Sequence, residues 1–297
     1  MSKQILVITG GSKKRLDPFK EASGRLGVDL TTASFSELSY ILNDGNFKLK
    51  VNGVDVASYG VVYIRLVGKR REDAILLTEY AKDKGIKVLD TTHLNQGVLP
   101  KSLEIKKLFE AGVLVPKTYF GRVLDIFEKG QEVLGKWFVI KSTSGKRSKA
   151  VWSPKTKEEA EILKADLLKR EENGERFFAQ SFVYASQRER YFVVGDKIVA
   201  GITRPTIWRR RFLERVNGEM PEGKREPIVP IPENDAKITL SAARVASLEI
   251  AGVDVVHDEV SGETFILEVN SAPRWEGVSH DAGINIEEEI VKYLASL

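Results

Sequence analysis

The chain has 297 residues, of which 42% are hydrophobic and 30% are charged, a balance typical of folded globular proteins. This length exceeds one compact domain, so we expect two or three lobes around a shared cleft. The absence of cysteine excludes disulfides, thiolate metal sites and thiol catalysis. A net charge of +4 with local basic clusters favours anionic ligands. There is no secretory leader pattern and no run of roughly 20 apolar residues, so we expect a cytoplasmic protein without a membrane partner.

The first hundred residues alternate between strand-like and helix-like segments. Strands are predicted at 4–9, 29–33, 61–66 and 87–89, with helices at 18–26 and 71–84. This order predicts βαβ units and a parallel sheet. The turn Gly10-Gly11-Ser12 lacks the full dinucleotide-binding fingerprint and is interpreted as a tight turn. Arg65, near the carboxyl end of its strand, is a candidate to reach a ligand cleft.

The middle of the chain predicts a lid that could cover a nucleotide. A helix at 102–111 places Lys101 at its positive end. A hairpin follows, with strands at 137–141 and 150–152 around a small basic loop, and then a helix at 157–172. Lys141 ends an apolar strand and needs an anionic partner, for which a nucleotide phosphate is suitable. The alternative is a lysine that extends to solvent.

The last part of the chain predicts mostly antiparallel strands. The predicted elements are a strand at 176–183, a hairpin at 191–194 and 197–203, a long irregular basic stretch at 204–232, a helix at 236–251, a final hairpin at 253–257 and 264–270, and a helix at 286–294. Together with the first hundred residues, this pattern indicates a mixed α/β (α+β) fold.

The final hairpin carries the most informative polar residues. If 260–262 form a three-residue loop with a left-handed Gly262, Glu259 pairs with Glu263 and Asp254 lies opposite Glu268. Two carboxylates with Cβ atoms about 5 Å apart repel unless a cation relieves them, and magnesium prefers such ligands. A two-residue turn would separate them, and a solvated face is the alternative. By alternation Asn270 joins their face, while the core face holds Val253, Val255, Phe265, Leu267 and Val269.

Three segments carry a resemblance to a known family. They are Ala251-Gly252-Val253-Asp254-Val255, Leu267-Glu268-Val269-Asn270-Ser271-Ala272-Pro273, and Arg190-Tyr191-Phe192-Val193-Val194-Gly195-Asp196. From Lys101 to the C-terminus the chain resembles the ATP-grasp superfamily, especially its RimK-like branch. The resemblance implies an ATP-grasp fold with an N-terminal Rossmann-like preATP-grasp domain at 1–98. A central lid subdomain at 99–182 and a C-terminal subdomain at 183–297, with the metal site, would follow.

The resemblance also implies a reaction and its residues. The implied activity is an ATP-dependent carboxylate–amine ligase that forms an acyl phosphate and then an amide, with an amino acid and a peptide, protein or small-molecule acceptor as substrates. It implies catalytic roles for Arg190, Arg204 and Lys141, and Mg²⁺, with Mn²⁺ as an alternative, at Asp254, Glu268 and Asn270. The implied ATP-binding residues are Lys101, Lys141, Ser142, Ser144, Gly145, Gln180, Ser181, Phe182, Val183 and Arg190.

The sequence departs from the family pattern at two charged positions, and other functions stay open. Arg188 replaces the usual acidic residue, and Arg274 stands where glycine is usual. A phosphotransferase of the same fold is one alternative. A non-catalytic module that binds nucleic acid through clusters such as 209–211 is another, although we disfavour a nucleic-acid partner. Homo-oligomer formation is left open. The three histidines, His93, His257 and His280, are interpreted as structural or surface residues.

Overall fold

The fold is taken from a computed structural model, which describes residues 4–43, 45–89, 101–143, 151–207, 209, 218 and 225–297. Several predicted features lie outside this part of the chain. They are the loop residues Ser144 and Gly145, His93, and most of the basic stretch that follows Ile207.

The N-terminal sheet has the predicted parallel βαβ arrangement. Its strand order is β2–β1–β6–β7, and every pairing is parallel. Alternate residues of the first strand enter different cores, because Ile5 and Val7 belong to one apolar cluster and Leu6 and Ile8 to another. A strand buried on both faces explains its unbroken apolar run. The elements are β1 (Ile5–Thr9), α1 (Asp17–Leu26), β2 (Leu30–Ser34), β6 (Val61–Leu66), α2 (Arg71–Asp83) and β7 (Lys87–Leu89).

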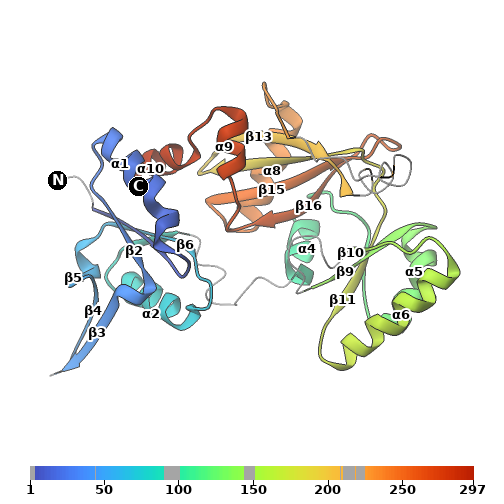
Figure 1. The fold of residues 1–297 in the computed structure, drawn as a ribbon, viewed down its shortest axis with the longest axis horizontal. Coiled ribbons are helices and arrows are strands. Elements are labelled where there is room, and N and C mark those ends of the chain that lie inside the picture. Colours follow the sequence, from blue (N-terminus) through green and yellow to red (C-terminus); the bar gives the residue numbers. More distant parts are fainter. Residues whose placement is uncertain are drawn as a thin grey trace.

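A second, three-stranded sheet in this region was not predicted from the sequence. It consists of β3 (Leu38–Asn43), β4 (Asn46–Val51) and β5 (Val54–Asp55), in the order β3–β4–β5. We call residues 38–51 the N-terminal hairpin. Figure 1 shows this hairpin projecting away from the other sheets, beside α2. Strand β3 is exposed over most of its length and shows no alternation between apolar and polar residues, so its sequence does not indicate a strand. Strand β4 does carry this signal, because Phe47, Leu49 and Val51 alternate with polar residues, and it was overlooked.

The central sheet has its own apolar core. Its strand order is β10–β9–β11–β8, and two helices pack on it. The buried members of this core include Ile126, Ile140, Leu167 and Phe177. Strand β8 and helix α5 were not predicted. The elements are β8 (Thr118–Phe120), α5 (Val123–Leu134), β9 (Phe138–Ser142), β10 (Val151–Trp152), α6 (Lys157–Glu172) and β11 (Phe177–Ser181).

The C-terminal sheet is antiparallel, with strand order β14–β13–β12–β15–β16. A helix is present where one was predicted at 236–251, but its predicted C-terminal boundary is wrong. It stops at Val245, Ser247 takes a left-handed conformation with φ of 56°, and Ile250 already begins the next strand. The elements are α4 (Lys101–Glu110), β12 (Gln187–Val194), β13 (Lys197–Pro205), β14 (Glu226–Pro227), α8 (Glu233–Val245), β15 (Ile250–His257), β16 (Thr264–Asn270), α9 (Glu276–Ala282), which was not predicted, and α10 (Ile286–Ser296).

One apolar cluster joins the N-terminal sheet to the C-terminal sheet. Phe19 and Tyr63 from the N-terminal region pack in the same cluster as Trp275 and Ile290. Helices α1 and α10 lie side by side (Figure 1), and Arg25 forms an ion pair with Glu288 at 3.5 Å. The predicted division into 1–98, 99–182 and 183–297 stays a prediction, and its first boundary falls outside the described residues.

Candidate functional site

The final hairpin places the two predicted metal-binding carboxylates opposite each other. Asp254 on β15 pairs with Glu268 on β16, and Gly252 pairs with Asn270, so the three polar side chains share one face. The turn itself was predicted wrongly. Gly262 is left-handed as expected, with φ of 74°, but the turn is closed by Asp258, and not Glu259: the Asp258 amide donates to the Glu263 carbonyl, and the Asp258 carbonyl accepts from the Gly262 amide.

A β-bulge shifts the pairing register of β15 and β16 by one residue between the turn and the carboxylates. Val255 pairs with Ile266, whereas Asp254 pairs with Glu268, so Leu267 is an extra residue without a partner on β15. The bulge also changes the core face. Ile266 is buried there with Val269, while Phe265 and Leu267 are only partly buried, so the prediction that these two fill the core is wrong.

Asp254 is held by two arginines from the neighbouring strand. Strand β12 pairs with β15, which sets Arg190 opposite Asp254 and, by alternation, Arg188 on the same face. The guanidinium of Arg190 donates two hydrogen bonds to the carboxylate, at 2.5 and 2.7 Å, and Arg188 lies 3.5 Å from it. Burial would raise the pKa of Asp254, but the two arginines outweigh it and hold the pKa below its usual range.

Glu268 is paired with a lysine from helix α4. The Lys101 ammonium lies 2.5 Å from a Glu268 oxygen and 3.5 Å from a Glu104 oxygen. Burial tends to lower the pKa of Lys101, but the two carboxylates raise it above its ordinary value. They also offset the unfavourable placement of a cation at a helix N-terminus. Glu104, which was not predicted as a site residue, is 6% exposed and accepts a hydrogen bond from the Val269 amide at 3.1 Å.

Lys141 lies in a second cluster, on the central sheet. Strands β9 and β11 place Lys141 and Gln180 on the same face, and the Lys141 ammonium donates to the Gln180 amide oxygen at 2.5 Å. The Gln180 amide nitrogen donates in turn to Thr118 at 3.0 Å, which fixes the orientation of the amide. Burial lowers the pKa of Lys141 to about 8, the charges of Glu268 and Asp254 counteract this effect, and those of Lys101 and Arg188 add to it. Lys141 is therefore electrostatically coupled to the carboxylates of the final hairpin.

The remaining described residues of the predicted nucleotide site lie on β9 or at the end of β11. Ser142 points to the other face of β9, where its hydroxyl donates to Glu175 at 2.6 Å. The backbone amides of Ser181 and Phe182 donate to the carbonyls of residues 117 and 137, and the Phe182 ring contacts the ring of Tyr184. Val183 follows β11 and is partly buried. Their proposed contact with adenine stays a prediction.

Arg204 adds a third arginine to the face that carries Asp254. It lies opposite Arg188 in the pairing of β12 with β13, so two guanidinium groups sit on neighbouring strands. Like charges directly opposite each other are destabilising unless an anion lies between them. Arg204 forms no ion pair with the described residues. This face of the sheet is therefore suited to a polyanionic ligand.

Arg65 reaches the loop that follows the final hairpin. Its guanidinium donates to the Pro273 carbonyl at 2.7 Å and lies 3.9 Å from the ring centroid of Trp275. On its other side, Pro273 packs against Gly252, where an added Cβ would lie 2.6 Å from the Pro273 Cβ. The loop is thus held between the N-terminal sheet and β15. Sequence patterns identify Arg65 only as a strand-end residue and give no sign of this contact.

His257 belongs to a polar cluster on the opposite face of the sheet. Its Nε2 atom lies 3.1 Å from Asp235, whose carboxylate also accepts a hydrogen bond from Tyr191 at 2.5 Å. Asp235 is 1% exposed and lies in the first turn of helix α8. Because residues 189, 191 and 257 alternate with 190 and 254, this cluster faces away from the carboxylate pair. It agrees with the interpretation of His257 as a structural residue.

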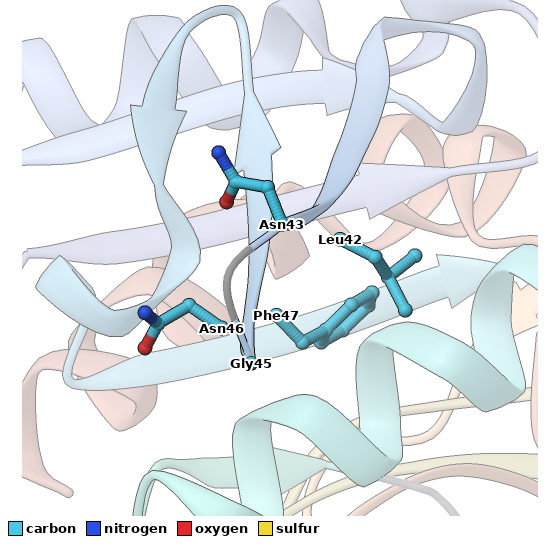
Figure 2. A pocket seen from close by; sticks show the side chains of 5 residues that line it. All are labelled: Leu42, Asn43, Gly45, Asn46 and Phe47. Atoms are coloured by element: carbon cyan, nitrogen blue, oxygen red, sulfur yellow. The ribbon is translucent and has the colours of Figure 1, made fainter.

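Three further features of the described residues bound the site. They contain no group of three histidine, aspartate or glutamate side chains placed to hold a metal ion, so the predicted set of two carboxylates and one amide is the candidate. None of their helices is long and apolar enough to cross a membrane. A hollow at the tip of the N-terminal hairpin is shown in Figure 2 and contains no predicted site residue. It is lined by Leu42, Asn43, Gly45, Asn46 and Phe47.

Comparisons with known proteins identify relatives of this chain both in sequence and in fold. The probable alpha-L-glutamate ligase of Cellvibrio japonicus is 30% identical over 194 residues, which are 64% of this chain and 61% of that protein. The chain thus spans less than two thirds of that relative. The structure of the ATP-grasp ligase PsnB with a minimal precursor aligns with a TM-score of 0.76 at 17% identity, over 100% of this chain and 99% of that one.

A second solved structure is the macrocyclase MdnC of Microcystis aeruginosa bound to its precursor peptide MdnA. It aligns with a TM-score of 0.72 at 15% identity, over 99% of this chain and 100% of that one. At these identities the two structures establish the fold. The RimK-like ATP-grasp domain family matches residues 101–294, which is more than half of the chain. The chain therefore belongs to the RimK-like ATP-grasp family.

Proposed function

We propose that this chain is an ATP- and magnesium-dependent carboxylate–amine ligase that forms an amide bond through an acyl phosphate. The observation that carries the proposal is the opposed pair of Asp254 and Glu268, with Lys101, Lys141 and Arg190 around it. Acidic and basic groups packed this densely suit a polyphosphate and the cation that accompanies it. Membership of the family supports the same chemistry.

The residues present fit a magnesium ion. Asp254 and Glu268 offer carboxylate oxygens, and Asn270 adds an amide whose nitrogen donates to the Gly252 carbonyl at 3.3 Å, so its oxygen can serve as a ligand. The ion would neutralise phosphate charge, and Mn²⁺ would fit the same oxygen ligands. The repulsion between the two carboxylates is relieved in the structure by Arg190 and Lys101, so a metal ion would take over part of their role.

The cationic side chains would bind and orient ATP. Lys101 and Lys141 would hold phosphates, Ser144 and Gly145 are proposed as further phosphate contacts, and residues 180–183 would contact adenine. Ser142 could contribute only its backbone, because its hydroxyl donates to Glu175 on the other face of β9. Gln180 supports phosphate binding by Lys141 indirectly, because the Gln180 amide is fixed between Thr118 and the Lys141 ammonium. A lysine held in this way is pre-organised for an anion, which lowers the entropic cost of binding.

The reaction would proceed in two balanced steps. A substrate carboxylate oxygen attacks the γ-phosphorus, the bond to the β-γ bridging oxygen breaks, and ADP leaves. The amine nitrogen then attacks the acyl carbonyl, phosphate leaves with the C–O bond electrons, and the nitrogen loses a proton. Arg190, Arg204 and Lys141 would stabilise the charge on the transferred phosphoryl group, so catalysis is mainly positioning and electrostatics. No side-chain nucleophile is needed, which suits a chain without cysteine.

The substrates that we propose are an amino acid and a peptide, protein or small-molecule acceptor. The Cellvibrio relative is named a probable alpha-L-glutamate ligase, which supports an amino-acid substrate. PsnB and MdnC are described with precursor peptides, which supports a peptide as the other substrate. The three arginines at 188, 190 and 204 favour acidic groups on one of the two.

The decisive experiment measures ADP release and amide formation during a screen of amino acids and peptide acceptors. Glu268→Ala should abolish both, because it removes a metal ligand and leaves Lys101 without its closest partner. Glu263→Ala is the matched control, since Glu263 is an exposed carboxylate on the same hairpin and should keep full turnover. Full turnover by Glu268→Ala would refute the assignment. ADP release with a stable phosphorylated product and no amide would identify a phosphotransferase instead.

A further inference from the structure

Arg274 is an exposed cation between two buried residues. Pro273 and Trp275 on either side of it are buried, and Trp275 is 2% exposed. The Arg274 guanidinium forms no ion pair and no hydrogen bond with the residues that the structure describes. A guanidinium carries five N–H donors, so without a partner in the fold it keeps its full capacity to bind an anion.

The backbone on both sides of Arg274 is held in place. The Pro273 carbonyl accepts a hydrogen bond from Arg65 at 2.7 Å, and the Trp275 indole N–H donates to Glu287 at 2.7 Å. The Arg65 guanidinium also lies 3.9 Å from the centroid of the Trp275 ring. Because the main chain is already ordered at both neighbours, only the side chain of Arg274 has to be ordered when a ligand binds, which lowers the entropic cost.

The loop that carries Arg274 crosses the face of the sheet that holds the carboxylate pair. Gly252 and Asp254 are two residues apart on β15, so a Cβ at Gly252 would point to the same face as the Asp254 side chain. That Cβ would lie 2.6 Å from the Pro273 Cβ, which places Pro273 on this face. Two residues of a strand span about 7 Å, so Pro273 packs about that far along β15 from Asp254. Arg274 therefore lies at the border of the candidate site.

A carboxylate of the substrate is the ligand that suits this position. Figure 1 shows the N-terminal sheet and the central sheet at opposite ends of the molecule. Lys141, which is proposed to hold ATP phosphates, belongs to the central sheet, whereas the loop of Arg274 is anchored by Arg65 from the N-terminal sheet. Arg274 thus approaches the carboxylate pair from the side away from Lys141. A guanidinium there can form two parallel hydrogen bonds with a carboxylate.

We propose that Arg274 binds a carboxylate of the substrate that does not react, and thereby selects an acidic amino acid or an acidic peptide residue over its uncharged counterpart. This inference rests on the proposed ligase function, because it concerns the substrate of the same site. Glycine, which is usual at this position in the family, has no side chain that could make this contact. The selectivity would therefore belong to this chain and not to the family as a whole.

The test measures equilibrium binding to the full chain by calorimetry, in the presence of magnesium and ADP. The probes are L-glutamate with L-glutamine, for a free amino acid, and the peptide Ala-Glu-Ala with Ala-Gln-Ala, for a peptide residue. We expect the wild type to bind the acidic member of one pair at least about tenfold more tightly than the neutral member, since a hydrogen bond to a charged group contributes about this much. The pair that shows the preference identifies the source of the carboxylate.

Arg274→Gln should lower this preference at least about tenfold by weakening the binding of the acidic member alone, whereas Arg274→Lys should keep part of it because the charge remains. Arg274→Glu should weaken the binding of the acidic member further, because like charges repel. Arg244→Gln is the matched control, since Arg244 is an exposed arginine in the last turn of α8, which packs on the opposite face of the sheet. The Kd for ADP should be unchanged in all four variants.

Two results would overturn the proposal. One is a wild type that binds neither acidic probe more tightly than its neutral counterpart. The other is an Arg274→Gln variant that keeps the wild-type preference, or that binds both members of the pair equally less tightly. Failure of the proposed ligase function is a separate result, in which no substrate leads to ADP release or amide formation although the acidic preference and its dependence on Arg274 are observed.

Discussion

Lys141 should make nucleotide binding depend on pH in the mildly alkaline range. Burial lowers the pKa of this lysine from 10.5 to about 8. Without a bound anion, the protonated fraction is then about 90% at pH 7, about 50% at pH 8 and about 10% at pH 9. If only the protonated form binds phosphate, the apparent Kd for ADP rises about fivefold from pH 8 to 9 and about tenfold from pH 7 to 9.

The assay is a calorimetric titration of ADP with magnesium at constant ionic strength from pH 7 to 9. Lys141→Arg should bind with little dependence on pH, because a guanidinium stays protonated throughout this range. Lys101→Arg is the matched control and should keep the wild-type profile, since Glu104 and Glu268 hold the pKa of Lys101 above its ordinary value. The role of the Lys141 ammonium in phosphate binding would be refuted by either of two results. One is a wild-type Kd for ADP that does not change with pH, and the other is a Kd that changes equally with pH in wild type and Lys141→Arg.

The same shift predicts how stability depends on pH. The pKa of Lys141 is lower in the folded chain than its ordinary value of 10.5, so between pH 8 and 10.5 the unfolded chain binds more protons. The contribution of Lys141 to the free energy of unfolding therefore rises with pH in this window, and it is most unfavourable below pH 8. Chemical denaturation at pH 7.5 and 9.5 should show that the free energy of unfolding of the wild type rises relative to that of Lys141→Met at the higher pH, and an unchanged or falling relative value would contradict the shift.

Two further substitutions test how the loop after β16 is held. Gly252→Ala would place a Cβ 2.6 Å from the Pro273 Cβ and should lower the free energy of unfolding by about 1–3 kcal/mol, measured by denaturant titration. Arg65→Ala removes the hydrogen bond to Pro273 and the contact with Trp275, and should cost about 1–3 kcal/mol. Arg65→Lys should restore part of this loss, and wild-type stability in Arg65→Ala would show that the contact is dispensable.

The carboxylate pair could be predicted from sequence because its geometry is local. Both strands belong to one hairpin, and strand alternation decides which residues share a face. The turn was nevertheless assigned one residue too short, and the bulge at Leu267 shifts the register by the same one residue. A bulge has no signature in this sequence, since Leu267 is an ordinary apolar residue of a strand. The predicted pairing of Asp254 with Glu268 is therefore confirmed although the predicted turn is wrong.

The contacts between distant segments could not be predicted. Arg65 and Pro273 are 208 residues apart, and Glu104 reaches the Val269 amide across 165 residues. Glu104 carried one weak signal, because it lies on the same side of its helix as the apolar Ile105 and Leu108, where an acidic residue needs a partner. The same limit applies to Arg188, whose proximity to Asp254 depends on the pairing of β12 with β15.

The apolar cluster shared by Phe19, Tyr63, Trp275 and Ile290 couples the integrity of the catalytic strands to residues far from them. Since β12, which carries Arg190, contributes Phe192 to this cluster, loosening α1 or α10 would reduce the population of chains in which Arg190 is positioned beside Asp254. Substitutions in those helices could thus abolish turnover inside a cell through degradation of partly opened molecules, while every residue proposed to contact ATP remains intact.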